Sequence, residues 1–187
     1  MKWCKDPKVE HLLRSLGIKF DTGTVKLSEI DRTLSAEKQV RLGKKINDDW
    51  VIQYGQAMQD GSAFPMPVLN KLRNGYFIWS GNHRTASAEL IGEEQLDAYI
   101  VEVQDERICD ILPRVVNAIE AQGVMSKDEK LVHARYLHEQ HSMTTQDVAR
   151  LLGIRCEWVT KYIAMQKTAE KIEAAGVNAN GFSTRII

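Results

Sequence analysis

The chain has 187 residues, of which 43% are hydrophobic and 27% charged, a composition typical of an ordinary soluble protein. Basic and acidic residues balance at 25 each, which argues against a polybasic tail, so nucleic-acid binding would need a local basic face. No apolar run approaches the roughly 18 residues that cross a bilayer, and the three cysteines lie singly. We therefore expect a cytoplasmic protein with reduced thiols and no membrane partner.

The first third of the chain predicts two helices and a strand. A short amphipathic helix is expected within residues 1–20, followed by a turn at 21–23. Alternating apolar and polar residues predict a half-buried strand over 24–30. A second helix is expected over 48–59, where apolar residues form one stripe and either Asn47 or Asp48 is the candidate cap.

The sequence from 76 to 92, YFIWSGNHRTASAELIG, predicts a strand, a tight turn at Gly81 and a helix from Thr85. The strand is expected to form a hairpin with residues 68–71. The first amides of a helix have no partners within it, so a turn that ends in His83-Arg84 offers N–H donors and a cation to a phosphate. A plain connection between strand and helix is the alternative.

The second half of the chain changes from mixed to helical structure. A strand is expected over 96–103 and a helix over 108–120, which Pro113 either kinks or begins. Because strands end before this point, we expect an α+β domain over 1–105 and a helical domain over 106–187.

Residues 144–165, TTQDVARLLGIRCEWVTKYIAM, predict two short helices joined by Gly153. The small Ala149 in the first helix and the aliphatic Val159 in the second suit a steep crossing, so we predict a helix-turn-helix. The second helix of that motif enters the major groove of double-stranded DNA. A purely structural pair of helices is the alternative. The predicted DNA contacts are Thr145, Gln146, Arg155, Glu157, Trp158, Thr160 and Lys161.

Several side chains allow two interpretations. Trp158 can contact a sugar or a thymine methyl, or pack against a neighbouring helix. His83 can bind phosphate or act as a general acid, or it can only form a hydrogen bond across its turn. His133, His138 and His141 can bind a metal ion or be solvated, and the second is favoured.

Over residues 22–167 these motifs together resemble the ParB family of partition and plasmid regulatory proteins. Family members carry a Gln-Pro-Arg-like element after the first strand, and Gln39-Val40-Arg41 stands in that place, with Pro65-Met66-Pro67 before the next strand. Their second motif, Gly-Glu-Arg-Arg before an alanine-rich helix, corresponds to Gly81-Asn82-His83-Arg84.

The resemblance implies a ParB/sulfiredoxin-like mixed domain followed by an all-α helix-turn-helix domain. In relatives the two motifs hold the triphosphate of CTP. A nucleotide site for CTP with magnesium is therefore implied at Gln39, Arg41, Gly81, Asn82, His83, Arg84 and Asn117.

Two departures from the family bear on enzymatic activity. In the third motif, Glu-Asn-x-Gln-Arg, only Asn117 fits, and Val116 stands where the metal-binding glutamate would be, which puts magnesium and CTP hydrolysis in question. Sulfiredoxins carry a cysteine where this chain has Asn82, so their chemistry is not expected. No catalytic or metal-binding residue is assigned, and any CTPase activity is expected to be weak.

The function expected from these features is that of a nucleoid-associated, homodimeric DNA-binding protein for partition or transcriptional regulation, with CTP as a switch. The alternative is a nucleotide-dependent enzyme of the same fold, a kinase or nuclease, that the helix-turn-helix tethers to DNA.

Overall fold

The structure, a computed structural model, describes residues 2–38, 46–119 and 125–176, and the chain forms two units, Met1–Met125 and Ser126–Ile187. The division corrects the expected boundary at 105, because helix α5 (Glu106–Ile119) belongs to the first unit. This helix packs against the sheet and buries its apolar side within the first unit. The sequence becomes all-helical at α5, which is before the end of the first unit.

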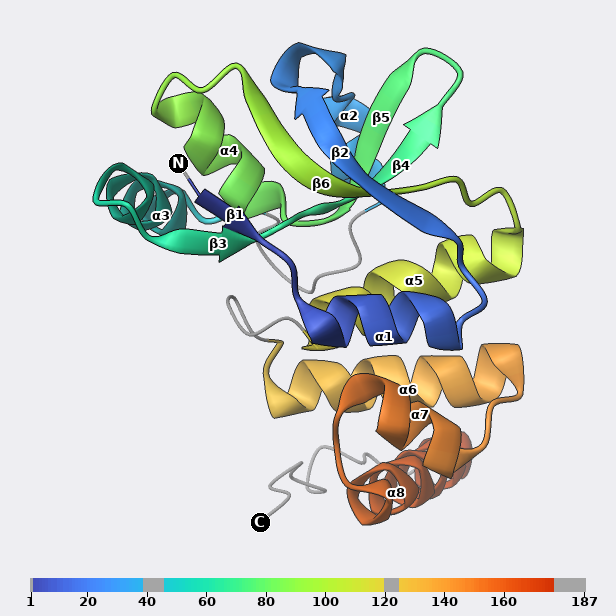
Figure 1. Ribbon diagram of the computed structural model, residues 1–187. Coiled ribbons are helices and arrows are strands. Elements are labelled where there is room, and N and C mark those ends of the chain that lie inside the picture. Colours follow the sequence, from blue (N-terminus) through green and yellow to red (C-terminus); the bar gives the residue numbers. More distant parts are fainter. Residues whose placement is uncertain (1, 39–45, 120–124, 177–187) are drawn as a thin grey trace. The chain divides into compact units, whose positions relative to one another are not determined.

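The first unit is built on a four-stranded sheet (Figure 1). The strand order is β2 (Phe20–Lys26), β6 (Gln95–Val101), β4 (Val68–Leu72) and β5 (Gly75–Ser80). Neighbouring strands are antiparallel except β4 and β6, which are parallel. The predicted hairpin is therefore present, with its turn at Arg73-Asn74.

Helices cover both faces of this sheet (Figure 1). On one face lie α3 (Asp48–Gln59) and α4 (Asn82–Leu90), and on the other lie α1 (Pro7–Ser15) and α5. Successive side chains of a strand alternate between the faces. The core on the α3 and α4 side includes Met58, Leu69, Ile78, Ala88, Leu96 and Ala98.

Some short elements were not predicted. Strand β1 (Lys2–Cys4) pairs in parallel with β3 (Ala63–Pro65), and a 3-10 turn, η1 (Leu27–Glu29), precedes α2 (Arg32–Glu37). Residues 21–23 were expected to turn but lie within β2, where a Cβ on Gly23 would be 3.3 Å from Ile100 Cδ1. This glycine accommodates a neighbouring side chain and does not form a turn.

The outer edge of β5 is covered by the segment that leads into α2. The Asp31 N–H donates to the Tyr76 carbonyl at 2.7 Å, and the Ile78 N–H donates to Ser35 Oγ at 2.9 Å. The Ser35 hydroxyl in turn donates to the Asp31 carbonyl. Backbone groups of the edge strand thus find partners outside the sheet.

The described part of the second unit consists of α6 (Lys127–His141), α7 (Thr145–Leu152) and α8 (Cys156–Ala174). A capping box of Ser126 and Glu129 begins α6, and the Thr144 hydroxyl accepts a hydrogen bond from the Asp147 N–H at the start of α7. None of the described helices is long and apolar enough to cross a membrane. The shared core consists of Leu131, Ala134, Leu137, Val148, Ala149, Leu152, Val159 and Ile163.

Tyr99 joins the sheet to the start of α1. Its hydroxyl oxygen accepts a hydrogen bond from the Asp6 N–H at 2.7 Å, and burial raises the pKa of Tyr99 to about 12. Asp6 in turn caps α1 by accepting a hydrogen bond from the Lys8 N–H. The phenol therefore fixes the residue that begins this helix.

We expect Tyr99→Phe to lower the free energy of unfolding by about 1 kcal/mol, because the Asp6 N–H loses its acceptor. The pKa of Tyr99 is raised from 10.0 in the folded protein, so its contribution is complete below pH 10 and declines towards pH 12. Urea unfolding should therefore show a difference between wild type and Tyr99→Phe that shrinks over this interval. The control Tyr76→Phe should change stability by less than about 0.5 kcal/mol, and equal losses in both variants would contradict the assignment.

Candidate functional site

The turn between β5 and α4 forms the base of the candidate phosphate site. Helix α4 begins at Asn82 and not at Thr85 as predicted, so His83 and Arg84 lie in its first turn. Gly81 is the residue before the helix, has a φ of +103°, and provides no side-chain cap. The first amides of α4 are thus not capped by this residue, as an anion site requires.

Gly81 is held against the connector between β3 and β4. A Cβ at this position would lie 2.6 Å from Pro67 Cβ and 3.1 Å from an Arg84 guanidinium nitrogen. No side chain fits at that distance, and L residues rarely adopt this φ. The close approach of two backbone segments therefore requires glycine here.

Arg84 ties the same connector to α4 from within. Its side chain is only 4% exposed, and its guanidinium donates a hydrogen bond to the Pro65 carbonyl at 2.5 Å. A cation at this depth stabilises the connector through backbone carbonyls. Phosphate binding by Arg84 stays a prediction, and the structure adds a role in folding.

His83 links α4 to the start of α3. Its Nε2 accepts a hydrogen bond from the Asn47 N–H at 2.9 Å, and its ring lies 5.4 Å from that of Trp50. Because a backbone N–H can only donate, Nε2 carries no proton and the imidazole is neutral, protonated at Nδ1. The hydrogen bond reaches another helix and does not cross the turn of His83.

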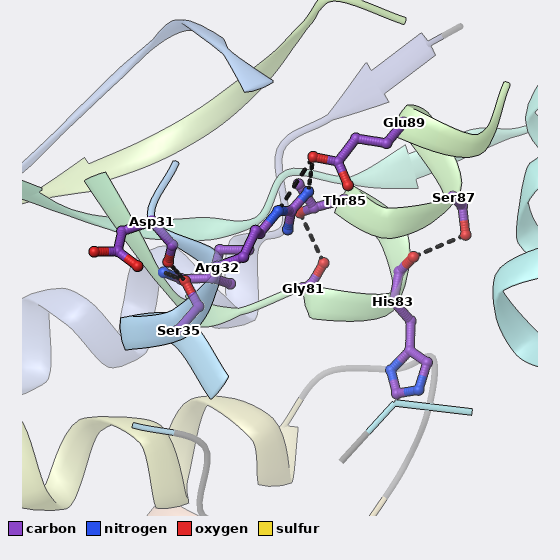
Figure 2. A network of polar contacts seen from close by, with 9 residues as sticks. Asp31, Arg32, Ser35, Gly81, His83, Thr85, Ser87 and Glu89 are labelled. Atoms are coloured by element: carbon purple, nitrogen blue, oxygen red, sulfur yellow. Dashed lines mark hydrogen bonds and ion pairs between the residues drawn. The ribbon is translucent and has the colours of Figure 1, made fainter. Parts of the chain in front are cut away.

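Hydroxyl groups of α4 complete this network, which Figure 2 shows from close by. Thr85 Oγ1 donates to the Gly81 carbonyl at 2.9 Å. Ser87 Oγ lies 2.7 Å from the His83 carbonyl and 2.9 Å from the Val51 carbonyl in α3. On the outer side of α4, Arg32 forms an ion pair with Glu89. Contacts at both ends of α4 thus hold the helix.

Ser80, the last residue of β5, is a site residue that the sequence analysis missed. Its side chain is 0% exposed, and its hydroxyl has no recorded hydrogen-bond partner. A buried hydroxyl without a partner is costly and calls for an explanation, such as a ligand. Its place directly before the glycine turn was a signal available in the sequence.

The structure brings Asn117 of α5 to the end of β5. Its amide nitrogen is 3.3 Å from the Trp79 carbonyl and 2.6 Å from that of Pro113, and the side chain is 9% exposed. Pro113 itself lies inside α5, so it does not begin the helix. Val116 is fully buried and belongs to the core. Within residues 2–38, 46–119 and 125–176, no group of three or more His, Cys, Asp or Glu could hold a metal ion.

Gln39 and Arg41, the other predicted phosphate contacts, lie outside the described residues. The described residues on either side approach the site: Ser35 accepts from the Ile78 N–H of β5, and Asn47 donates to His83 of α4. The roles of Gln39 and Arg41 stay predictions.

In the second unit, most of the predicted DNA contacts are exposed. Thr145 and Trp158 are half-buried, and the Thr145 hydroxyl accepts a hydrogen bond from the Cys156 thiol at 3.6 Å. Of the three histidines, His133 is buried and His138 Nδ1 lies 2.7 Å from the Met143 carbonyl, so neither is simply solvated. The remaining predicted contacts are exposed, namely Gln146, Arg155, Glu157, Thr160 and Lys161.

We expect Gly81→Ala to lower the free energy of unfolding by about 3 kcal/mol or more, through both the left-handed φ and the overlap with Pro67. Gly92→Ala is the matched control at the other end of α4, because Gly92 also has a positive φ, +82°, but nothing within 4 Å of a Cβ. The control should lose about 1–2 kcal/mol. Urea unfolding of both variants measures the difference, and equal losses would disprove the close approach.

No protein-family model matches the chain, and no curated protein matches it either. Among solved structures, the chain is similar to the C-terminally truncated chromosome-partitioning protein ParB from Caulobacter crescentus, complexed to the centromeric parS site. The two chains share 13% identity with a TM-score of 0.60, and the match covers 84% of this chain and 80% of that chain. It is also similar to the same truncated ParB complexed with CTP-gamma-S, with 14% identity and a TM-score of 0.43 over 83% of this chain and 86% of that chain.

A Pnob8-like ParB-N domain matches with 10% identity and a TM-score of 0.47, over 72% of this chain and 61% of that chain. The likeness at a TM-score of 0.60 extends over most of both chains and concerns the fold. The resemblance predicted from the motifs is therefore confirmed at this level: the chain has the fold of the ParB chromosome-partitioning proteins.

Proposed function

We propose that the chain is a DNA-binding protein of the ParB type, in which α7 and α8 form the helix-turn-helix of an all-α domain. The observation that carries the proposal is the division of the helix pair into a buried and an exposed side. Val148, Ala149 and Leu152 of α7 pack inward, whereas Glu157, Thr160 and Lys161 of α8 are exposed.

The turn between the two helices supports this assignment. Gly153 has a φ of +63° and ends α7, and the Ile154 N–H donates to the Ala149 carbonyl at 3.0 Å. Helix α8 then starts after Arg155. In a helix-turn-helix, a short turn that often contains glycine joins two helices, and the second helix enters the major groove.

A single helix-turn-helix covers little DNA, so the proposal includes a homodimer on two half-sites. ParB neighbours are chromosome-partitioning proteins, and one is complexed to a centromeric site. Partition or transcriptional regulation at the nucleoid is the corresponding proposal for this chain. The kinase or nuclease alternative stays a prediction from the sequence.

We also propose that the turn at Gly81 binds the phosphates of a nucleotide, with CTP as the first candidate. The observation that favours this second role is the buried Ser80 hydroxyl, for which no partner is recorded, beside Gly81, which provides no side-chain cap to α4. Amides and a hydroxyl would donate hydrogen bonds to phosphate oxygens. Because the guanidinium of Arg84 also holds Pro65, nucleotide binding there would be coupled to the position of the connector.

The DNA proposal predicts sequence-specific binding by α8. Selection of duplexes from a randomised pool should enrich an inverted repeat whose half-sites are about one helical turn apart. Thr160→Val should change the enriched bases at a defined position, because an exposed hydroxyl on this helix is removed. Thr168→Val, further along the same helix, is the control and should enrich the wild-type sequence. A pool that shows no enrichment would count against specific recognition.

The nucleotide proposal predicts that Ser80→Ala weakens CTP binding about tenfold or more, because the variant loses one hydrogen bond to a charged phosphate group. The same change should not lower the stability of the free protein, because the hydroxyl has no partner to lose. Calorimetric titration with CTP, ATP and GTP, with and without magnesium, measures the first effect, and urea unfolding measures the second.

Ser87→Ala is the matched control, because this hydroxyl bonds the Val51 and His83 carbonyls. It should lower stability with little effect on CTP affinity. Wild-type affinity in Ser80→Ala, or no binding of any nucleotide, would show that the turn is only a structural connection.

A further inference from the structure

Two cations meet over one aromatic ring at the start of α8. The Lys127 ammonium nitrogen, from the first residue of α6, lies 4.1 Å from the centre of the Trp158 ring. The guanidinium carbon of Arg155, the residue before α8, lies 4.9 Å from the same centre. Lys127 and Trp158 are half-buried, whereas Arg155 is exposed. One ring therefore fixes the positions of two positive charges from different segments.

These two cations differ from two other arginines of the same unit. Arg135 is paired with Glu139 and Glu170, and Arg150 is paired with Asp147. For Lys127 and Arg155, no ion pair is recorded within the described part of this unit, residues 126–176. A cation over a ring is attracted by the π electrons, but its charge is not neutralised. Both charges remain able to attract an anion from outside the protein.

The placement of both charges is unfavourable with respect to the helix dipoles. The start of a helix carries a partial positive charge, and Lys127 and Arg155 lie at the starts of α6 and α8. Arg155 makes no side-chain hydrogen bond as the cap of α8, a position that small polar residues favour. Stability of the helices does not account for two cations at these sites, whereas binding of phosphate would.

We propose that Lys127 and Arg155 clamp phosphates of one DNA strand, and that Trp158 is a positioning residue that holds both cations. The inference rests on the proposed DNA binding and adds Lys127, a residue of α6 outside the helix pair, to the contact surface. Arg155 and Trp158 lie at the start of the proposed recognition helix. A helix that enters the major groove with its first turn brings this end close to the phosphates that border the groove.

The test measures the salt dependence of binding by the full chain to a fluorescent duplex of arbitrary sequence, about 20–30 base pairs long. Binding to such a duplex depends on phosphate contacts, so no operator is needed. Anisotropy titrations between about 50 and 200 mM salt give the slope of log K against log salt concentration. Lys127→Gln and Arg155→Gln should each make this slope shallower by about 0.9.

Lys171→Gln is the matched control, because it removes an equal charge from an exposed position in the last turn of α8. It should keep the wild-type slope. Thermal unfolding of Lys127→Gln should occur close to the wild-type temperature, because loss of the contact with the Trp158 ring is offset by removal of a cation from the start of a helix. A purely structural role of Lys127 would instead lower the unfolding temperature and leave the slope unchanged.

The role of Trp158 is tested by a double-mutant cycle. Trp158→Leu keeps an apolar side chain without a π face, so Lys127→Gln should reduce affinity less in this background than in wild type. Trp158→Tyr should restore much of the coupling. If Lys127→Gln binds with the same slope as Lys171→Gln, the clamp is wrong and DNA binding stands. If the wild-type chain does not bind the duplex at all, the proposed function fails together with the clamp.

Discussion

The close approach of the Gly81 turn to Pro67 is the constraint on which the first unit's site depends. It sets where β5 ends and α4 begins, and it leaves no room for a side chain at the turn. The buried Arg84 guanidinium then holds the same connector through the Pro65 carbonyl, and Ser87 extends the contact to α3 through Val51. A shift at any of these points would move the start of α4, so the turn, the connector and α3 must be positioned together.

The two proposed sites use positive charge in different ways. In the first unit Arg84 is buried and satisfied by carbonyls, and His83 is neutral, so the donors near the turn are amides and hydroxyls. In the second unit the cations Arg155 and Lys161 are exposed. Interactions between exposed charges weaken strongly with salt, whereas hydrogen bonds in a buried site are screened less. Ionic strength would therefore affect the two proposed ligands unequally.

Local signals in the sequence predicted most helices and strands. The features that the sequence did not predict depend on contacts between residues far apart in the chain. Helix α3 was predicted to its observed ends from its apolar stripe and the capping residue before it, and the hairpin was predicted between residues 68–71 and the strand that follows. The strand at residues 21–23 was missed because the fit of Gly23 beside Ile100 joins distant segments. The position of Ser80 before the glycine turn could be read from the sequence, but the burial of its hydroxyl without a partner follows only from the surrounding packing.

The cover on β5 has a consequence for edge-to-edge aggregation of the sheet. An edge strand with free N–H and C=O groups can pair with the edge of another molecule, which is a common start of aggregation. Here the Tyr76 carbonyl and the Ile78 N–H are already bonded to Asp31 and Ser35. The short segment before and within α2 thus occupies the place that a strand from a second molecule would take. The Ser35 hydroxyl and the Asp31 amide thus occupy hydrogen-bonding groups of β5 that an additional strand would need.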